Sequence, residues 1–302
     1  MELNSFQEKL ASILPQIELR FDEPMSRHTS FRIGGAAEVM AFPKNEAELS
    51  ELLKVSKELD TCHAILGAGT NVLAPDEGMT GLVICLKDCL NGTELLPDNF
   101  LRVMGGVTMS RAAVFAANHG LSGLEFAHGI PGTVGGGVYM NAGAYGGEIG
   151  QVCIQATVMD ADGQLHVRSR EEMDFRYRHS RLEETGEIVT NAVFQLTAAP
   201  TEEIRQRMKE LQARRIASQP LDYPSAGSAF KRPTGGYAAA LIDQAGLKGY
   251  RVGNAAISGK HAGFAINLGG ATAADVTQLL RQVSDKVYEN TGIRLEPEIR
   301  IW

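Results

Sequence analysis

The sequence predicts an α+β protein of two domains, and three observations support this fold class. The chain has 302 residues, whereas one domain usually holds about 100–200. Short apolar runs bounded by glycine or polar residues, which predict strands, are mixed with segments whose apolar residues recur at helical spacing. The pattern changes near Pro200, where a long helix is expected. We therefore expect a first domain over residues 1–199, with its core over about 27–197, and a smaller second domain over residues 200–302.

The first domain is predicted to contain strands, two helices and a hairpin. Asn45 and Glu48 form a capping-box pattern ahead of an apolar stripe, which marks the start of one helix. A second helix, rich in small residues, is expected over 111–118. Alternating apolar residues and a turn at Asp162-Gly163 predict a hairpin over 152–167. Short apolar runs predict further strands over residues 64–66, 81–86, 101–104 and 187–196.

The second domain is predicted to begin with a helix that Thr201 caps. A short helix is expected over residues 237–245. The last helix has the most regular pattern, since Thr272 and Asp275 form its capping box. Its apolar stripe consists of Val276, Leu279, Leu280, Val283 and Val287.

Composition and charge exclude several classes of protein. Hydrophobic residues make up 44% and charged residues 22% of the chain, which is typical of a globular protein. The formal charge of −7 argues against a general nucleic-acid binder, because such binding needs Lys and Arg to neutralise phosphates. No apolar run approaches the ~20 residues of a membrane span. Near the N-terminus, Glu2 and Glu8 replace the basic start of a secretory signal. We expect a cytoplasmic protein that binds neither nucleic acid nor membrane.

The cysteines and histidines predict no metal site. The four cysteines lack the C-x-x-C spacing of zinc and redox motifs, and the seven histidines are scattered without ligand spacing. Cysteines in a long cytosolic chain are usually reduced. We therefore assign no role to Cys62, Cys85, Cys89 and Cys153.

Two glycine-rich segments are the first candidates for a binding site. Gly67-Ala68-Gly69-Thr70-Asn71 follows a predicted strand, and eight of the nineteen residues from Gly129 to Gly147 are glycine. Glycine lets the backbone turn tightly and bring its N–H groups close to an anion, so both segments suit a pyrophosphate. One short Gly-x-Gly is often only a turn, but two such loops favour a site.

The common dinucleotide and nucleotide motifs are absent. A Rossmann fingerprint needs Gly-x-Gly-x-x-Gly at a strand-to-helix turn, yet Val72 stands at the third glycine position and Pro75 interrupts the expected helix. No Gly-x-x-x-x-Gly-Lys-Ser/Thr loop occurs. Any dinucleotide must therefore be held by another fold.

Arg178 is the first of three candidate catalytic residues. It lies in Tyr177-Arg178-His179-Ser180, at the end of a basic stretch that could equally be a solvated surface. A guanidinium stays charged and donates two parallel hydrogen bonds. It therefore suits a planar carboxylate or an enolate.

Ser228 and Glu298 are the other two candidates. Ser228 lies in Gly227-Ser228-Ala229-Phe230-Lys231, a segment that is also compatible with a plain turn. Because no Gly-x-Ser-x-Gly elbow surrounds it, a proton donor is favoured over a covalent nucleophile. Glu298 lies in Leu295-Glu296-Pro297-Glu298-Ile299-Arg300, near the chain end, where acidic residues are usually exposed. Its alternation with Ile299 and Ile301 nevertheless predicts a half-buried strand.

The glycine loops, including Asn141-Ala142-Gly143-Ala144-Tyr145-Gly146, resemble the FAD-binding domain shared by vanillyl-alcohol oxidase and para-cresol methylhydroxylase (PCMH). The resemblance implies a two-lobed FAD-binding domain of the PCMH type, followed by a smaller α+β substrate-binding domain. It also implies that FAD is held by Gly67, Ala68, Gly69, Thr70, Asn71, Ile130, Pro131, Gly132, Thr133, Gly135, Gly136 and Gly143.

With the three catalytic motifs included, nearly the whole chain resembles the UDP-N-acetylenolpyruvoylglucosamine reductases, or UDP-N-acetylmuramate dehydrogenases. The family's Tyr-Arg-x-Ser motif makes Arg178 the catalytic arginine. Its Gly-Ser-x-Phe-Lys motif makes Ser228 the residue that protonates the reacting carbon. Its Leu-Glu-Pro-Glu-x-Arg motif makes Glu298, rather than Glu296, the catalytic glutamate. Arg232 departs from the family, since many members have Asn there.

The resemblance implies an NADPH-dependent reduction of the enolpyruvyl ether of a UDP-sugar nucleotide, in peptidoglycan precursor synthesis. NADPH would reduce FAD, and NADPH and the sugar nucleotide would take turns in one cleft. Substrate contacts are expected from Tyr145, Arg214, Lys231 and Arg232, and the protein is expected to be a monomer.

Two other functions remain open at this point. One is a different FAD-dependent oxidase or dehydrogenase of the same fold, acting on a small alcohol or sugar; the three catalytic motifs argue against it. The other is a non-catalytic nucleotide-binding module, for which replacing Ser228 by Ala would have no kinetic effect.

Overall fold

The computed structural model describes residues 3–302, which form two compact units. The first unit consists of the chain up to Phe21, Glu38–Ala68 and Thr80–Arg214, and the second consists of Asp22–Ala37, Gly69–Met79 and Arg215–Trp302. Each unit therefore gathers separate stretches of sequence. The expected division between residues 199 and 200 follows chain order instead, and it stays a prediction about the functional domains.

The first unit contains a four-stranded sheet in the order β1-β2-β5-β3. Its strands are β1 (Glu18–Pro24), β2 (Ala36–Phe42), β3 (His63–Leu66) and β5 (Met79–Cys85). β3 and β5 are parallel, and Leu66 at the end of β3 lies opposite Cys85. The first glycine loop therefore begins at the carboxyl end of a parallel strand pair.

Two helices pack on this sheet. α2 (Glu46–Glu58) begins after Asn45, whose side chain accepts the Glu48 N–H at 2.9 Å, as the sequence predicts. Its buried leucines, Leu49, Leu52 and Leu53, share a core with apolar residues of β2 and β5. α1 (Ser5–Ile13) was absent from the sequence predictions, although the side chains of Asn4 and Gln7 form a capping box at its start.

The first unit also contains a five-stranded antiparallel sheet in the order β12-β11-β13-β7-β6. The strands are β6 (Thr93–Leu96), β7 (Phe100–Met104), β11 (Cys153–Met159), β12 (Leu165–Ser169) and β13 (Ile188–Gln195). α4 (Val134–Tyr139) packs against β13 and β7, and α3 (Met109–Asn118) packs against α4. α7 (Thr201–Ser218) begins at Thr201, so this residue is the first of the helix rather than its cap. The predicted strands, hairpin and helices of this region are confirmed.

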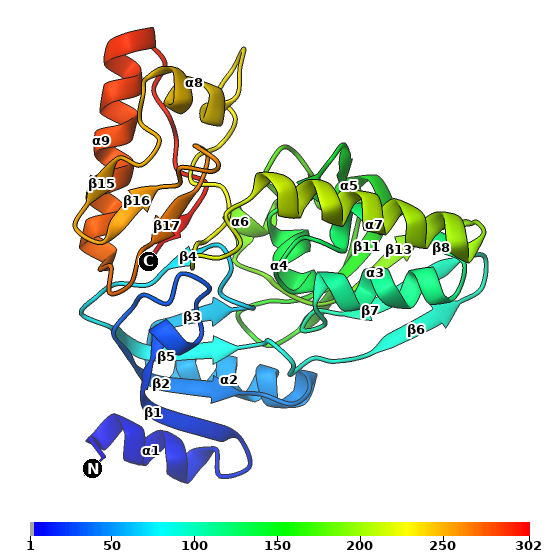
Figure 1. Ribbon diagram of the computed structural model, residues 1–302. Helices are drawn as coiled ribbons and strands as arrows, with labels where there is room; N and C mark the ends of the chain where they lie inside the picture. The colour runs from blue at the N-terminus through cyan, green and yellow to red at the C-terminus, as the bar shows by residue number, and fades with distance from the viewer. Residues whose placement is uncertain (1–2) are drawn as a thin grey trace. The chain divides into compact units, whose positions relative to one another are not determined.

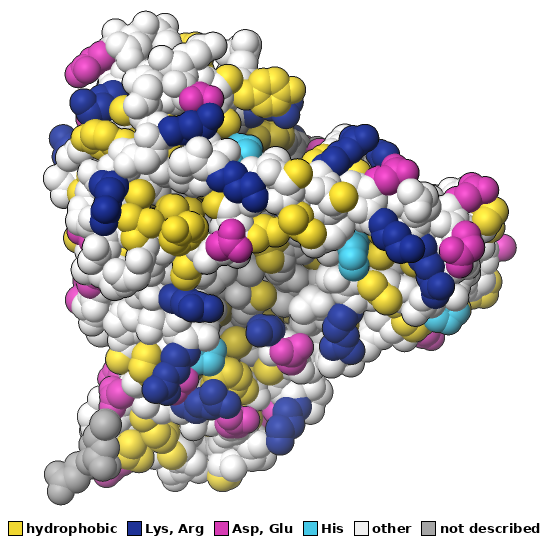
Figure 2. Space-filling view, in the orientation of Figure 1, with side chains coloured by type: hydrophobic (Ala, Val, Ile, Leu, Met, Phe, Trp, Pro, Cys, Tyr) yellow, Lys and Arg dark blue, Asp and Glu magenta, His cyan; other side chains and the backbone are white. Residues whose placement is uncertain are grey.

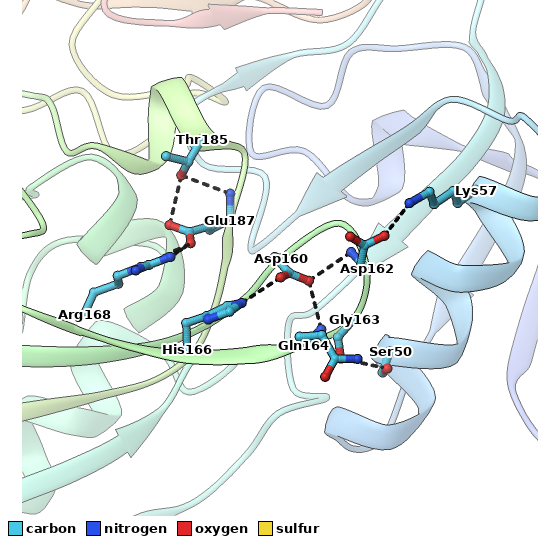
Figure 3. A network of polar contacts seen from close by, with 10 residues as sticks. All are labelled: Ser50, Lys57, Asp160, Asp162, Gly163, Gln164, His166, Arg168, Thr185 and Glu187. Atoms are coloured by element: carbon cyan, nitrogen blue, oxygen red, sulfur yellow. Dashed lines mark hydrogen bonds and ion pairs between the residues drawn. The ribbon is translucent and has the colours of Figure 1, made fainter.

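A polar network fixes the turn of the β11–β12 hairpin (Figure 3). The Asp160 carboxylate accepts the N–H groups of Asp162 and Gln164, both at 2.9 Å. Its other oxygen lies 2.6 Å from the His166 ring. Ser50 of α2 donates to the Gly163 carbonyl at 2.9 Å. The hairpin turn is therefore joined to the helix of the other sheet.

The second unit is built around an antiparallel sheet of three short strands, β15 (Arg251–Val252), β16 (Ala255–Ile257) and β17 (Ala265–Asn267). α9 (Ala273–Thr291) lies along β15 and β16 and contacts α8 (Ala238–Gln244) (Figure 1). The predicted capping box of Thr272 and Asp275 is present, and the predicted apolar stripe of α9 is fully buried.

The shorter elements complete the fold. They are η1 (Met25–Arg27), β4 (Val72–Leu73), β8 (Leu121–Ser122), η2 (Glu125–Ala127), β9 (Gly143–Ala144), β10 (Gly147–Glu148), α5 (Ile149–Val152), α6 (Leu182–Thr185), β14 (Thr197–Ala198) and β18 (Arg300–Ile301). β18 pairs in parallel with β4 inside the second unit.

The predicted alternation of the C-terminal strand is only partly correct. Ile299 is 3% exposed, as predicted, but Ile301 is 48% exposed. The strand itself is limited to Arg300–Ile301, because β4 offers only two residues for pairing.

The surface of the described residues shows mixed charge. On the face in Figure 2, Lys and Arg side chains are interspersed with Asp, Glu and apolar side chains. Among residues 3–302, no helix is both long and apolar enough to cross a membrane. The same residues bring together no cluster of His, Cys, Asp and Glu that could hold a metal ion.

Candidate active site

The two predicted glycine loops lie against each other in the first unit. A Cβ atom built on Gly67 would lie 2.7 Å from Oγ1 of Thr133, which is too close for any larger residue without a shift. Thr133 is 2% exposed, and its hydroxyl caps α4 by accepting the Gly136 N–H at 3.3 Å. The fold therefore joins the two segments that were predicted to hold one cofactor.

The second glycine loop rests on the turn that follows β7. The N–H groups of Val134 and Gly135 donate to the carbonyls of Val107 and Gly105, each at 2.8 Å. A Cβ on Gly105 would lie 2.3 Å from the Val189 carbonyl oxygen, so only glycine fits beneath the loop. The role of Gly105 was not predicted, although a Gly-Gly pair after a strand is the type of signal that marks close backbone packing.

The loops provide backbone donors for an anion. In residues 3–302, the N–H groups of Gly67 and Ala68 donate to no protein acceptor. Gly132 has φ +135°, a conformation that is strained for any residue with a side chain. A pyrophosphate that lies close to the backbone needs amide N–H groups without protein acceptors, and it needs the space that glycine leaves by lacking a side chain. These features fit FAD.

The other predicted FAD residues are placed along the same loops. Ile130 packs against the core of the five-stranded sheet, and Pro131 and Gly136 are exposed. Gly69 is the first residue of this loop that belongs to the second unit, and its φ is +61°. A Cβ atom built on Gly69 would lie 2.0 Å from the His28 carbonyl oxygen. Thr70 lies beside it and is half-buried.

Arg178 contacts the C-terminal part of the second glycine-rich segment. Its Nη2 donates to the Gly143 carbonyl at 3.0 Å, and its backbone has φ +53°, which is uncommon for a non-glycine residue. The buried Asn141 side chain holds this segment by donating to the Arg176 carbonyl at 2.9 Å. Tyr145, at the tip of the β9–β10 hairpin, is 39% exposed. The predicted catalytic arginine and a predicted substrate contact thus lie on adjoining segments of the first unit.

Ser228 and Glu298 are brought together in the second unit. The Glu298 N–H donates to the Ala229 carbonyl at 2.9 Å, so Glu298 lies beside the residue that follows Ser228. The backbones of Ser228 and Phe264 form a β-bridge, which holds the serine from the other side. Within residues 3–302, the Ser228 hydroxyl makes no hydrogen bond. A hydroxyl donor and a carboxyl group are therefore held at neighbouring positions.

Glu296 differs from Glu298 in its surroundings. It is exposed and forms an ion pair with Lys231, while its carbonyl accepts the Lys231 N–H at 2.8 Å. Glu298 is half-buried. The two carboxylates of the C-terminal segment therefore occupy different environments.

Arg232 stacks on an aromatic ring that was not predicted to take part in the site. Its guanidinium carbon lies 4.4 Å from the centre of the Tyr237 ring, and Tyr237 is 62% exposed. Cation–π contact of this kind helps to hold the guanidinium in place. Arg214, the remaining predicted substrate contact, is exposed on α7 at the end of the first unit.

Three of the four cysteines are unsuited to nucleophilic chemistry. Burial raises the pKa of the Cys85 thiol, and it raises the pKa of both Cys89 and Cys153 to about 12. All four cysteines are free thiols. Because the thiolate is the nucleophile, the thiols of Cys85, Cys89 and Cys153 are inert near neutral pH.

The fold and its glycine loops define a flavoprotein, since residues 37–169 match a family described as an FAD binding domain. Residues 219–302 match the C-terminal domain of UDP-N-acetylenolpyruvoylglucosamine reductase. The chain is 46% identical to the reductase of that name from Agathobacter rectalis, covering 98% of both chains. It is 45% identical to that of Caldanaerobacter subterraneus, covering 97% of both chains. The chain belongs to the UDP-N-acetylenolpyruvoylglucosamine reductase family.

A solved structure agrees with these matches. The crystal structure of UDP-N-acetylenolpyruvylglucosamine reductase from Thermus caldophilus superposes with a TM-score of 0.80 at 37% identity. The superposition covers 95% of this chain and 99% of that one. The predicted family, the α+β fold with an FAD-binding domain and the FAD cofactor are thereby confirmed. The roles of individual residues stay predictions.

Proposed function

We propose that this chain reduces the enolpyruvyl ether of UDP-N-acetylglucosamine enolpyruvate to UDP-N-acetylmuramate, a step in peptidoglycan precursor and cell wall synthesis. It is an FAD-containing, NADPH-dependent oxidoreductase that acts on a CH–CH bond. The relatives that share nearly its full length bear the name of this reductase. The observation that carries the proposal is the 2.9 Å hydrogen bond between Glu298 and Ala229, which brings Glu298 beside Ser228.

Bound FAD would supply the two-electron chemistry that links NADPH to reduction of the enolpyruvyl group at its vinyl carbon. The residues that would hold its pyrophosphate lie in the two joined loops and are, in particular, Gly67, Ala68 and Gly132. Thr133 supports them from α4. No Rossmann fingerprint is present, so NADPH and the sugar nucleotide would use one cleft in turn.

Arg178 would stabilise the negative charge that develops on the substrate. Hydride addition leaves an enolate-like carbanion next to the substrate carboxylate. A guanidinium that is already oriented needs no reorganisation as this charge forms. The hydrogen bond to Gly143 and the buried Asn141 beneath the segment provide that orientation.

Ser228 would protonate the carbanion. Its O–H bond breaks as the new C–H bond forms at the α carbon, and the serine oxygen then regains a proton from solvent. Glu298 would assist as an acid or as a hydrogen-bond partner. The free hydroxyl of Ser228 and the neighbouring position of Glu298 support these roles.

The UDP-sugar would be bound by basic and aromatic side chains. Lys231 and Arg232 follow Ser228 in the chain, and Arg214 carries a third positive charge. Tyr145 is exposed at its hairpin tip, where it can cover a ligand. We further propose that the enzyme is cytoplasmic, since NADPH and UDP-sugars are made inside the cell, and that it is a monomer.

An anaerobic absorption experiment on the purified holoprotein tests this function. NADPH should bleach the flavin spectrum, and only the enolpyruvyl UDP-sugar should restore it. Flavin that oxygen reoxidises but the UDP-sugar does not would favour an oxidase that acts on a small alcohol or sugar. Protein that takes up no FAD would contradict the proposal as a whole.

A further inference from the structure

Asn71 holds the C-terminal segment at the position of Glu298. Its side-chain Nδ2 donates to the Glu298 carbonyl at 3.1 Å. Its own carbonyl accepts the Arg300 N–H at 2.9 Å. Both residues belong to the second unit, although they are 227 positions apart in sequence. Asn71 was predicted as a contact of FAD, whereas the structure engages its amide with the polypeptide.

The side chain of Asn71 is not needed to pair the two strands. β4 and β18 pair in parallel through Val72 and Arg300, and the Trp302 N–H donates to the Leu73 carbonyl at 3.1 Å. These bonds use backbone atoms alone, and Leu73 is fully buried. Loss of the Asn71 amide therefore leaves the pairing intact and removes one bond, the bond to Glu298.

The peptide groups on both sides of Glu298 are held. Its N–H donates to Ala229 at 2.9 Å, and its carbonyl accepts from Asn71 at 3.1 Å. The next side chain, Ile299, is 3% exposed and is anchored in the core of the second unit. With both peptide planes fixed, the direction of the Cα–Cβ bond of Glu298 is fixed as well. The carboxyl group can then turn only about its own side-chain bonds.

We propose that Asn71 is a positioning residue for Glu298, which acts by fixing the peptide plane that directs the glutamate carboxyl toward the substrate. The inference rests on the proposed function, in which Glu298 assists protonation. The rate of a catalysed step falls steeply when the contacts that hold its catalytic groups in place are loosened. Asn71 would therefore control the oxidative half-reaction rather than the binding of FAD.

The test compares the two half-reactions of the holoenzyme by anaerobic stopped-flow absorbance. Asn71→Ala and Asn71→Asp should leave FAD affinity and flavin reduction by NADPH unchanged. Reoxidation by the enolpyruvyl UDP-sugar should slow by about 10- to 100-fold, the usual effect of removing an outer contact of a functional group. The pH profile of reoxidation should shift as well, because the carboxyl that assists protonation is displaced.

A matched control is Asn254→Ala. The Asn254 amide also donates to a carbonyl of the second unit, but this carbonyl belongs to Gly270 rather than Glu298, and Asn254 is exposed. This variant should retain both half-reactions and the pH profile. Asn71→Ser is a third test variant, whose shorter polar side chain suits the half-buried position, so the test does not depend on the folding of one substitution.

Two results would overturn the proposal. One is weaker FAD binding with normal reoxidation at saturating FAD, which would make Asn71 a cofactor contact. The other is a loss of thermal stability with unchanged rates, which would make its role structural. Glu298→Gln separates the two levels of the argument. If Glu298→Gln reoxidises slowly and the Asn71 variants do not, only this inference fails; if Glu298→Gln reoxidises normally, the proposed role of Glu298 fails as well.

Discussion

Replacing Gly67 by alanine should weaken FAD binding through a single steric contact. The added Cβ would lie 2.7 Å from Thr133 Oγ1, and its next neighbours lie at 3.8 Å. Gly67 does not have a left-handed backbone, so alanine itself is not strained there. The whole cost therefore comes from moving one hydroxyl group. That hydroxyl caps α4, and loss of a cap costs about 1 kcal/mol, with about 1 kcal/mol more for overpacking.

When the whole cost of about 2 kcal/mol acts on the free energy of FAD binding, the FAD dissociation constant rises more than tenfold. The assay is fluorescence titration of apoprotein with FAD, repeated on Thr133→Ala and on the double variant. Thr133→Ala removes the clashing oxygen as well as the cap, so Gly67→Ala should add almost nothing in that background. Such non-additivity is the signature of a direct contact. Additive effects of the two substitutions would refute the reasoning.

Three further outcomes are expected. Ser228→Ala should slow flavin reoxidation by the UDP-sugar by about 10²- to 10⁴-fold, the usual worth of a general acid, and normal reoxidation in stopped-flow would exclude Ser228 as the proton donor. Tyr237→Leu should raise the KM for the UDP-sugar by about two- to fivefold, because the ~0.5–1 kcal/mol stacking on Arg232 is lost; steady-state kinetics with an unchanged KM would contradict this. Hydrogen bonds from the Gln164 backbone and from His166 lower the pKa of Asp160. The stability that these bonds confer is present above the ordinary carboxyl pKa and is lost as pH falls through the lowered value, so Asp160→Asn should flatten the acid limb of a thermal unfolding profile.

The elements that the sequence predicted well are those specified by neighbouring residues. The cap of α2 at Asn45 and that of α9 at Thr272 depend on side chains three residues away. The β11–β12 hairpin depends on alternation and on a turn at Asp162-Gly163. Local chemistry decides such features, so a local pattern is enough to predict them. The prediction of a buried Ile301 was wrong: Ile301 pairs with Leu73 of β4, yet it is 48% exposed. Alternation predicts which residues share a face of a strand, but not whether another element covers that face.

The sequence predicted which residues belong to the candidate site, but not the contacts that hold them. The motifs identified Ser228 and Glu298, but no local pattern shows that the Glu298 backbone pairs with Ala229. The role of Gly105 beneath the second loop depends on the carbonyl of Val189, a residue that is distant in sequence and packs against Gly105 in the fold. Such contacts are set by tertiary packing, and a single sequence contains no direct record of it.

The first glycine loop, Gly67–Asn71, makes two contacts that belong to different units of the fold. Gly67 packs on Thr133 in the first unit, and Asn71, four positions later, holds Glu298 in the second. A side chain at Gly67 would act on the cofactor loops, while a change at Asn71 would act on the glutamate. The two perturbations should therefore separate in kinetics: the first should alter FAD affinity, and the second should alter reoxidation of bound flavin. If both substitutions gave the same defect, the loop would be acting as one element, and the separate contacts of Gly67 and Asn71 would not explain its function.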